Sequence, residues 1–272
     1  MSYRKVFSMI GLTLVVTLVA VGHDTWLAPR EFNITRRSQV LFDLTSGMSF
    51  PILETSIKPD RIDAASCRLN NKVMKLLKPV SGSKSLMFPG KFEDDGTVTC
   101  WIDLKPRQLE LNERQVAEYF EEIDPSQAVR DAWKNMKSPR RWRESYVKHA
   151  KTLAYVGTSG DDQSWGEPVG TAFELVPEKN PFGLKAGDEL PIRVLKKGQP
   201  ITQLRVNIVL AGQKQGEFQT TDGEGRVSFL IKRAGRYLIR ATELRPATKP
   251  DLEWESDFTT LTIEIPVRRS WR

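Results

Sequence analysis

The chain has 272 residues, a formal net charge of +7 and a hydrophobic residue content of 39%. This length allows one large domain or two domains of ordinary size, and the composition excludes a wholly disordered chain. The basic residues are spread along the chain, so we interpret them as solvated strand faces and expect no nucleic-acid partner.

Residues 1–22 have the pattern of a secretory signal peptide. Basic side chains precede an uncharged apolar run over residues 6–22. Ala20 and Gly22 place small side chains at the third and first positions before a cleavage site at His23, as in secretory signal peptides. We therefore expect a periplasmic or secreted protein that starts at His23. An uncleaved N-terminal membrane anchor is the alternative, although the run is shorter than the roughly 20 residues of a membrane-spanning helix.

Residues 23–165 are expected to form an N-terminal β domain that carries a helical insert at about 110–148. Apolar and polar residues alternate over 38–47 and again over 96–106, which is typical of antiparallel strands. The second of these runs places four side chains on one face: Val98, Cys100, Ile102 and Leu104.

Cys67 and Cys100 are the two cysteines of the chain. In an oxidising compartment we expect them to form a disulfide, which would stabilise the fold by about 3–4 kcal/mol. A pair of buried free thiols is the alternative. The two cysteines do not have the close spacing of a zinc site.

The helical insert is predicted to begin at Asn112, whose side chain can cap a helix. Apolar residues then follow the spacing of one helix face: Val116, Tyr119, Phe120 and Ile123. Residues 124–126, Asp-Pro-Ser, are expected to end this helix, and a second helical segment to reach about Met136. Residues 138–157 are expected to begin as a helix and to become a strand near residue 151.

Residues 166–272 are expected to form a C-terminal β-sandwich. Short strands separated by turns every 8–12 residues or so favour an immunoglobulin-like or transthyretin-like type. The stretch Asp-Gly-Glu-Gly at 222–225 is typical of a tight hairpin turn. The expected fold class is therefore mainly β, with two antiparallel β-sandwich domains and a small helical insert.

Four stretches lie in an order that points to a known family. They are "HDTWLAP" at 23–29, "LELNERQVAEYFEEI" at 109–123, "RESYVKHAKTLAYVG" at 143–157, and the sandwich from "FELVPEKNPFG" at 173–183 to "DFTTLTIEI" at 257–265. In these stretches the chain resembles exported bacterial proteins built on a domain of unknown function, often labelled periplasmic components of cobalt or nickel uptake. The resemblance implies export, a role linked to a metal ion, an inner-membrane metal transporter as partner, and no catalytic set.

Cleavage before His23 would place an α-amino group and an imidazole on one residue, and both can bind one metal ion. An α-amino group has a pKa of about 7.7–8.0, so it deprotonates readily near neutral pH. Such nitrogen ligands suit the divalent ions of nickel, cobalt, copper and zinc. We therefore predict His23 as the primary metal ligand, with Asp24 as an oxygen ligand and His149 as a second imidazole. Packing or capping is the alternative role for His149.

The sequence contains no motif for the nucleophile elbow of hydrolases, for a P-loop or for a metalloprotease, so we expect binding rather than catalysis. The main hypothesis is an exported protein that binds a divalent transition metal. The alternative is a structural or adhesive β-sandwich module that binds a protein or a glycan without metal, with tryptophans as a sugar platform or as core packing. A copper oxidase with an N-terminal histidine brace is a third hypothesis.

Overall fold

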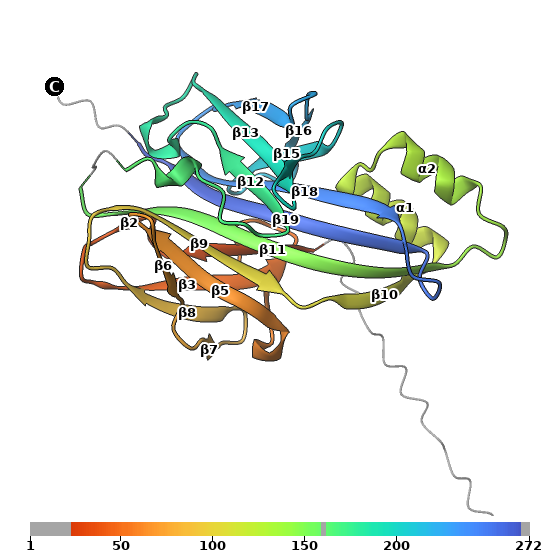
Figure 1. Cartoon of the computed structure of the whole chain (residues 1–272), viewed down its shortest axis with the longest axis horizontal. Coiled ribbons are helices and arrows are strands. Elements are labelled where there is room, and N and C mark those ends of the chain that lie inside the picture. Colours follow the sequence, from red (N-terminus) through yellow and green to blue (C-terminus); the bar gives the residue numbers. More distant parts are fainter. Residues whose placement is uncertain (1–22, 159–161, 268–272) are drawn as a thin grey trace, which may run out of the picture.

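The computed structural model describes residues 23–158 and 162–267, and its strands form three sheets (Figure 1). The expected signal peptide, residues 1–22, lies outside the described residues. The largest sheet has ten strands in the order β16-β15-β18-β19-β11-β9-β5-β6, with β10 and β2 also paired to β11. Its strands are β2 (Asn33–Ile34), β5 (Ile62–Leu69), β6 (Lys72–Lys75), β9 (Gly96–Leu104), β10 (Arg107–Leu111), β11 (Trp142–Val156), β15 (Arg205–Leu210), β16 (Glu217–Thr220), β18 (Gly235–Pro246) and β19 (Trp254–Ile265).

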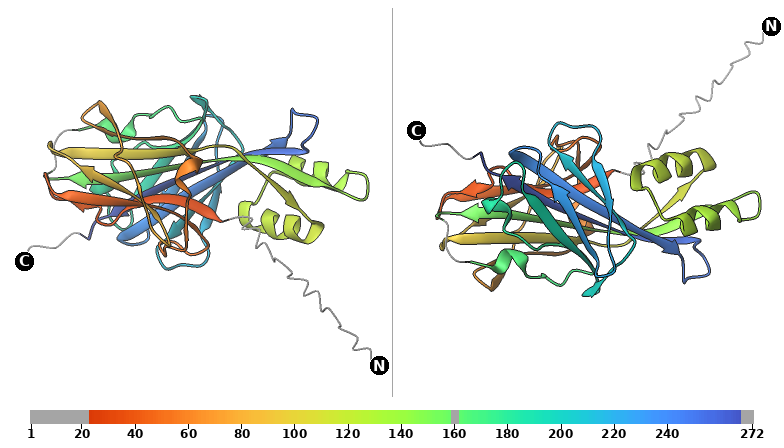
Figure 2. Two further views of the ribbon diagram at one scale, coloured as in Figure 1. Left: turned by 90° about the horizontal axis from the view of Figure 1, so that it is seen from below. Right: turned by 90° about the horizontal axis from the view of Figure 1, so that it is seen from above.

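Two smaller sheets cover opposite faces of this central sheet (Figures 1 and 2). The N-terminal sheet has the order β1-β3-β8-β7, with β4 paired to β3, and the C-terminal sheet has the order β12-β13-β14, with β17 paired to β13. The N-terminal sheet contains β1 (Asp24–Pro29), β3 (Gln39–Gly47), β4 (Thr55–Ser56), β7 (Val80–Ser81) and β8 (Leu86–Lys91). The C-terminal sheet contains β12 (Phe173–Pro177), β13 (Glu189–Lys196), β14 (Gln199–Pro200) and β17 (Arg226–Leu230). The short 3-10 turns are η1 (Pro59–Arg61), η2 (Ser164–Gly166) and η3 (Pro181–Gly183).

A separate hydrophobic core lies under each small sheet, and strand β11 contributes to both. Leu153 belongs to the C-terminal core, whereas Ala150, Ala154 and Val156 belong to the N-terminal core. Successive side chains of a strand point to opposite faces, so one strand can close two sandwiches. The face predicted for residues 96–106 also lies in the N-terminal core: Val98, Cys100, Ile102 and Leu104.

The boundary expected between residues 165 and 166 does not separate two sheets. Strand β11 precedes this point, yet it pairs in parallel with β19, from Glu144 opposite Trp254 to Thr152 opposite Thr262. The mainly β fold with a small helical insert is confirmed. The two sandwiches share one continuous sheet, and this sheet contains parallel as well as antiparallel pairs.

The helical insert consists of α1 (Glu113–Ile123) and α2 (Gln127–Lys134), which lie at one end of the long strands (Figure 1). Asn112 caps α1 as predicted, because its side chain accepts a hydrogen bond from the backbone N–H of Gln115 and the Gln115 side chain accepts one in return. The predicted apolar face of α1 is buried: Val116, Tyr119, Phe120 and Ile123.

The helical start expected for residues 138–157 is wrong, because strand β11 already begins at Trp142. The insert therefore ends near Lys134 instead of at about residue 148. The pairing of β11 with β10 and β19 on its two sides explains the difference. Hydrogen bonds to distant strands outweigh the weak helical pattern of the local sequence.

Candidate functional site

His23 lies directly before β1, whose backbone is held against the central sheet. The hydroxyl of Thr260 donates a hydrogen bond to the carbonyl oxygen of Thr25 across 2.7 Å. In the same way, the hydroxyl of Thr262 donates to the carbonyl oxygen of Leu27 across 2.5 Å. Strand β3 pairs along the other side of β1. These contacts fix the position of β1 and of His23, which directly precedes it.

Lys148 of β11 holds the backbone of His23. Its Nζ donates a hydrogen bond to the carbonyl oxygen of His23 across 2.5 Å. The same ammonium group lies 5.1 Å from the ring centroid of Phe258 and 5.7 Å from that of Tyr146, which are cation–π distances. This contact engages the carbonyl oxygen of His23 and does not use its nitrogen atoms.

A cavity of about 330 Å³ opens beside His23. It is lined by His23, Thr25, Ser46, Thr55, Ser56, Ile57, Lys58, Asp60, Arg61, Leu104, Arg107, Tyr146 and Lys148. Burial lowers the pKa of the His23 imidazole, and the positive charge of Lys148 lowers this pKa further. The ring is therefore neutral at pH 7, which is the form that binds metal ions.

The cavity is strongly basic. Its cationic lining residues are Lys58, Arg61, Arg107 and Lys148, against the single carboxylate of Asp60 in the lining. Within residues 23–158 and 162–267, none of these four cations has a carboxylate oxygen within 4.0 Å. Arg61 donates from Nη2 to the carbonyl oxygen of Lys105, while its Nε is buried without a hydrogen-bond partner in the described chain.

The ammonium group of Lys148 has an unfavourable environment for its charge. Burial lowers its pKa to about 8, and the positive charge of Arg61 acts in the same direction. The carboxylates of Asp24 and Glu144 oppose this shift from a distance. At pH 7 the lysine is still mostly charged, so the structure holds a cation here that lacks a direct ion pair.

Asp24 points to the other side of β1. Its carboxylate forms an ion pair with Arg240, whose Nε donates to the side-chain oxygen of Asn207 across 3.1 Å. Glu122 of α1 lines the same small cavity as Asp24, and burial, followed by the charge of Asp24, raises its pKa to about 7. The structure therefore places Asp24 in a different cavity from His23.

His149 is buried on the opposite face of β11 from Lys148, since the two residues are adjacent in one strand. Its Nδ1 lies 2.6 Å from a carboxylate oxygen of Asp103, and its Nε2 lies 3.6 Å from one of Asp257. Burial lowers the pKa of His149, but the bonds to the two carboxylates outweigh it and raise the pKa overall. The structure thus does not bring His149 and His23 together.

Asp257 connects His149 to a network of charged residues under the C-terminal sheet. It forms ion pairs with Lys196 of β13 and with Arg245 of β18. Burial alone would raise the pKa of Asp257, but the interactions with His149, Lys196 and Arg245 hold it far below its usual range. Each carboxylate and cation of this network has a partner of opposite charge, although the Nε2 of His149 is beyond hydrogen-bond distance of an acceptor in the described chain. These ion pairs fit a structural role for His149.

Among the described residues, no group of three or more His, Cys, Asp or Glu side chains is arranged to hold a metal ion. A metal at this site would therefore depend on the two nitrogens of His23 and on further ligands that the described residues do not hold ready as a cluster. Cys67 and Cys100 form the expected disulfide, which joins directly opposite residues of β5 and β9 and removes both thiols from the set of candidate ligands.

The tryptophans serve mainly as packing. Trp142 and Trp254 stack with ring centroids 4.6 Å apart in the core beside α1 and α2. Trp26, Trp101 and Trp133 are also buried. Trp271 lies outside the described residues.

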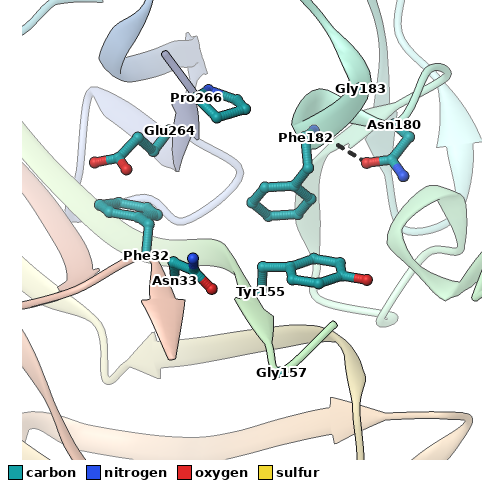
Figure 3. A pocket seen from close by; sticks show the side chains of 9 residues that line it. All are labelled: Phe32, Asn33, Tyr155, Gly157, Asn180, Phe182, Gly183, Glu264 and Pro266. Carbon is teal, nitrogen blue, oxygen red and sulfur yellow. Dashed lines mark hydrogen bonds between the residues drawn. The ribbon is translucent and has the colours of Figure 1, made fainter. Parts of the chain in front are cut away.

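A second, larger cavity of about 430 Å³ has an aromatic lining that the sequence did not reveal (Figure 3). Tyr155 and Phe182 meet edge to face with centroids 5.3 Å apart, and Phe32 lies across the cavity from them. Polar groups of Asn33 and Glu264 border the same space. Phe32 directly precedes β2, and the other residues come from β2, β11, η3 and β19, so the cavity forms where β11 joins the two sandwiches.

The fold and the site together define a mainly β protein of two joined sandwiches with a basic cavity at the head of its first strand. The model of a family described as a domain of unknown function, DUF4198, matches residues 20–244, so the chain belongs to this family. No curated protein matches the chain. Over the described residues, no helix has the length and apolar character needed to cross a membrane.

Several solved structures are distantly similar. The D0-D1 domain of intimin matches with 11% identity and a TM-score of 0.23, covering 88% of this chain and 96% of its own. The adhesin InvE of Yersinia pseudotuberculosis matches with 9% identity and a TM-score of 0.23, covering 90% and 59%. Murine CEACAM1b matches with 10% identity and a TM-score of 0.21, covering 90% and 100%. With TM-scores this low, these similarities support no inference about function.

Proposed function

We propose that the protein is exported and binds a divalent transition metal through His23 at its mature N-terminus. The observation that carries this proposal is the placement of His23. Strand β1 holds it at the edge of a cavity, with a neutral imidazole and with its carbonyl oxygen bound to Lys148. The oxygen is thus occupied, and the imidazole and the backbone nitrogen remain as the chelating pair.

The basic surroundings favour this chelate in one respect. Nearby positive charges disfavour protonation, and they would lower the pKa of a new α-amino group at His23 as they lower that of its imidazole. Both nitrogens would then lose their protons more readily, and the deprotonated nitrogens can bind Ni²⁺, Co²⁺, Cu²⁺ or Zn²⁺. A bound metal ion would be repelled by the positive charge of Lys148, so a further negatively charged ligand is needed at the site.

In this proposal the protein carries the metal outside the cytosol and delivers it to an inner-membrane transporter. The disulfide between Cys67 and Cys100 supports export, because such bonds persist in oxidising compartments. Transport, and not catalysis, is the role that the family resemblance implies.

Calorimetric titration tests the proposal with protein that starts at His23. We expect saturable binding of at least one of the four metal ions. His23→Ala removes the imidazole, and one glycine added before His23 keeps the imidazole but displaces the α-amino group. Both variants should lose at least ten-fold in affinity. Equal affinity in all three proteins would exclude the N-terminal chelate.

The aromatic cavity favours a second candidate function, a module that binds glycans without metal. The half-buried rings of Tyr155 and Phe182 line the cavity and offer apolar surface for a sugar ring, and Asn33 and Glu264 offer hydrogen-bonding groups nearby. Pockets that bind small molecules usually combine apolar side chains with a few hydrogen-bonding groups. Saturation-transfer NMR with a panel of oligosaccharides should show contacts that Phe182→Ala abolishes and Phe218→Ala, outside the cavity, retains. Unchanged signals in Phe182→Ala would rule out this cavity.

A further inference from the structure

We propose that the basic cavity beside His23 holds a small anion that carries carboxylate or phosphate oxygens. The anion binds between the side chains of β1, η1, β10 and β11. This proposal rests on the proposed function in one respect, since the anion would also fill the coordination positions that His23 leaves open on a bound metal.

The first argument is charge. Four cationic side chains line the cavity and lack a carboxylate within ion-pair distance in the described chain: Lys58, Arg61, Arg107 and Lys148. Two carboxylates whose charge favours the ammonium form of Lys148 are engaged elsewhere. Asp24 is paired with Arg240, and Glu144 accepts hydrogen bonds from Tyr119 and Trp142. The ammonium group of Lys148 and the Nε of Arg61 are buried, and buried charges in proteins are normally paired, so an anion in the cavity would supply the partner that these two groups lack. Lys58 and Arg107 are exposed and add to the positive charge of the lining.

The second argument is the pattern of hydrogen-bond donors. The buried Nε of Arg61 has no partner among the described residues, and Lys148 uses one of its three N–H groups on His23. The hydroxyl groups of Ser46 and Thr25 also line the cavity, but they are engaged with each other and with the carbonyl oxygen of Asp24. Guanidinium and ammonium groups are donors that suit the oxygen atoms of carboxylates and phosphates.

The third argument concerns size and the metal. A volume of about 330 Å³ accommodates a small organic acid or a phosphate with water. Four positive side chains repel a bare divalent cation, whereas a metal that arrives with an anionic chelator has little or no net positive charge. A bound anion would therefore offset the positive charge of the lining and allow a metal ion to bind the two nitrogens of His23 at the edge of the cavity.

Calorimetry on metal-free protein that starts at His23 tests the inference at fixed ionic strength. The probes are citrate, inorganic phosphate and glycerol as an uncharged control. We expect saturable binding of citrate, phosphate or both, and none of glycerol. Comparison of the two anions then separates carboxylate from phosphate recognition.

Substitutions locate the binding site. Lys148→Gln and Arg107→Gln should each weaken anion binding about ten- to a hundred-fold, as expected for the loss of a charged hydrogen bond. Because Arg107 and Lys58 are exposed, Arg107→Gln and Lys58→Gln keep the fold and serve if Lys148→Gln fails to fold. Arg114→Gln on α1 changes the net charge equally and should bind as the wild type does. Absent binding, or equal weakening by Arg114→Gln, would overturn the inference.

His23→Ala distinguishes the two proposals. It should abolish metal binding and leave the anion affinity of metal-free protein within about three-fold of the wild type. Anion binding without any metal binding would remove the proposed function and keep the anion cavity. Metal binding without any anion binding would do the reverse.

Discussion

The ammonium group of Lys148 donates a hydrogen bond to the backbone carbonyl oxygen of His23 across 2.5 Å, and this bond joins the start of β1 to the middle of β11. The two residues are distant in sequence. Their contact fixes the N-terminal end of the described chain over the central sheet and determines which atoms of His23 face the cavity.

Lys148→Met should therefore loosen the head of β1. We expect faster hydrogen exchange at the backbone amides of Asp24 and Thr25, while exchange in β11 stays slow because its ladders to β19 and β9 are unaffected. His23→Ala is the matched control, since it keeps the carbonyl oxygen and should preserve the protection. Mass spectrometry of exchanged peptides measures both. Unchanged exchange in Lys148→Met would show that β3 and the hydroxyl of Thr260 hold the N-terminal end of β1 without Lys148.

The pair of Asp103 and His149 predicts a pH dependence of stability. Because the folded state raises the pKa of His149 above 6.5, its contribution to the free energy of unfolding is fully present below pH 6.5. This contribution is lost as the pH rises through the folded-state pKa. Asp257 has a lowered pKa, so its contribution is present above pH 3.8 and is lost as the pH falls. Urea denaturation should therefore show greatest stability from these groups between pH 4 and 6.5 or so.

His149→Asn tests this assignment. It removes the partner of the Asp103 carboxylate and one of the three cations that face Asp257, so we expect a loss of about 1–3 kcal/mol in the free energy of unfolding. The decline of stability above pH 6.5 should also disappear. If His149 were a metal ligand instead, the variant would keep its stability in metal-free buffer.

The Cys67–Cys100 disulfide joins two buried residues of the N-terminal core. Replacing both cysteines by alanine should lower the free energy of unfolding by about 2–5 kcal/mol. Thermal unfolding with and without a reducing agent measures the effect. The reductant should destabilise the wild type and leave the double variant unchanged. Equal melting temperatures of both proteins would contradict a stabilising role.

Arg68 ties β5 to the connection between the two sandwiches. Its guanidinium donates to the carbonyl oxygens of Ser164, Glu167 and Pro168 across 2.7, 2.6 and 2.9 Å. We expect Arg68→Ala to reduce the free energy of unfolding by about 3 kcal/mol and to make residues 162–172 more sensitive to proteolysis. Arg36→Ala, which removes an exposed arginine, should change stability by less than about 0.5 kcal/mol. Equal effects of the two substitutions would argue against this role for Arg68.

Local patterns predicted the parts of the fold that depend on near neighbours. The cap of Asn112, the apolar face of α1 and the alternation along β9 were all recognisable, because each follows from spacings of a few residues. The sequence did not predict that residues 142–150 form a strand, because that strand depends on pairing with β19. The basic cavity was missed as well, because Lys58 and Arg61 at η1 lie far along the chain from Arg107 in β10 and from Lys148 in β11.

By itself, the sequence determined the mainly β class, the cap and apolar face of α1, and the interest of His23 and His149 as the two histidines of the chain. Only the tertiary structure decided that Lys148 faces His23 and that His149 faces Asp103 and Asp257. The physical reason is that strand alternation is local, whereas the choice of face depends on where β1 crosses and how β11 pairs. Those contacts join segments far apart in the chain, and no short stretch of sequence encodes them.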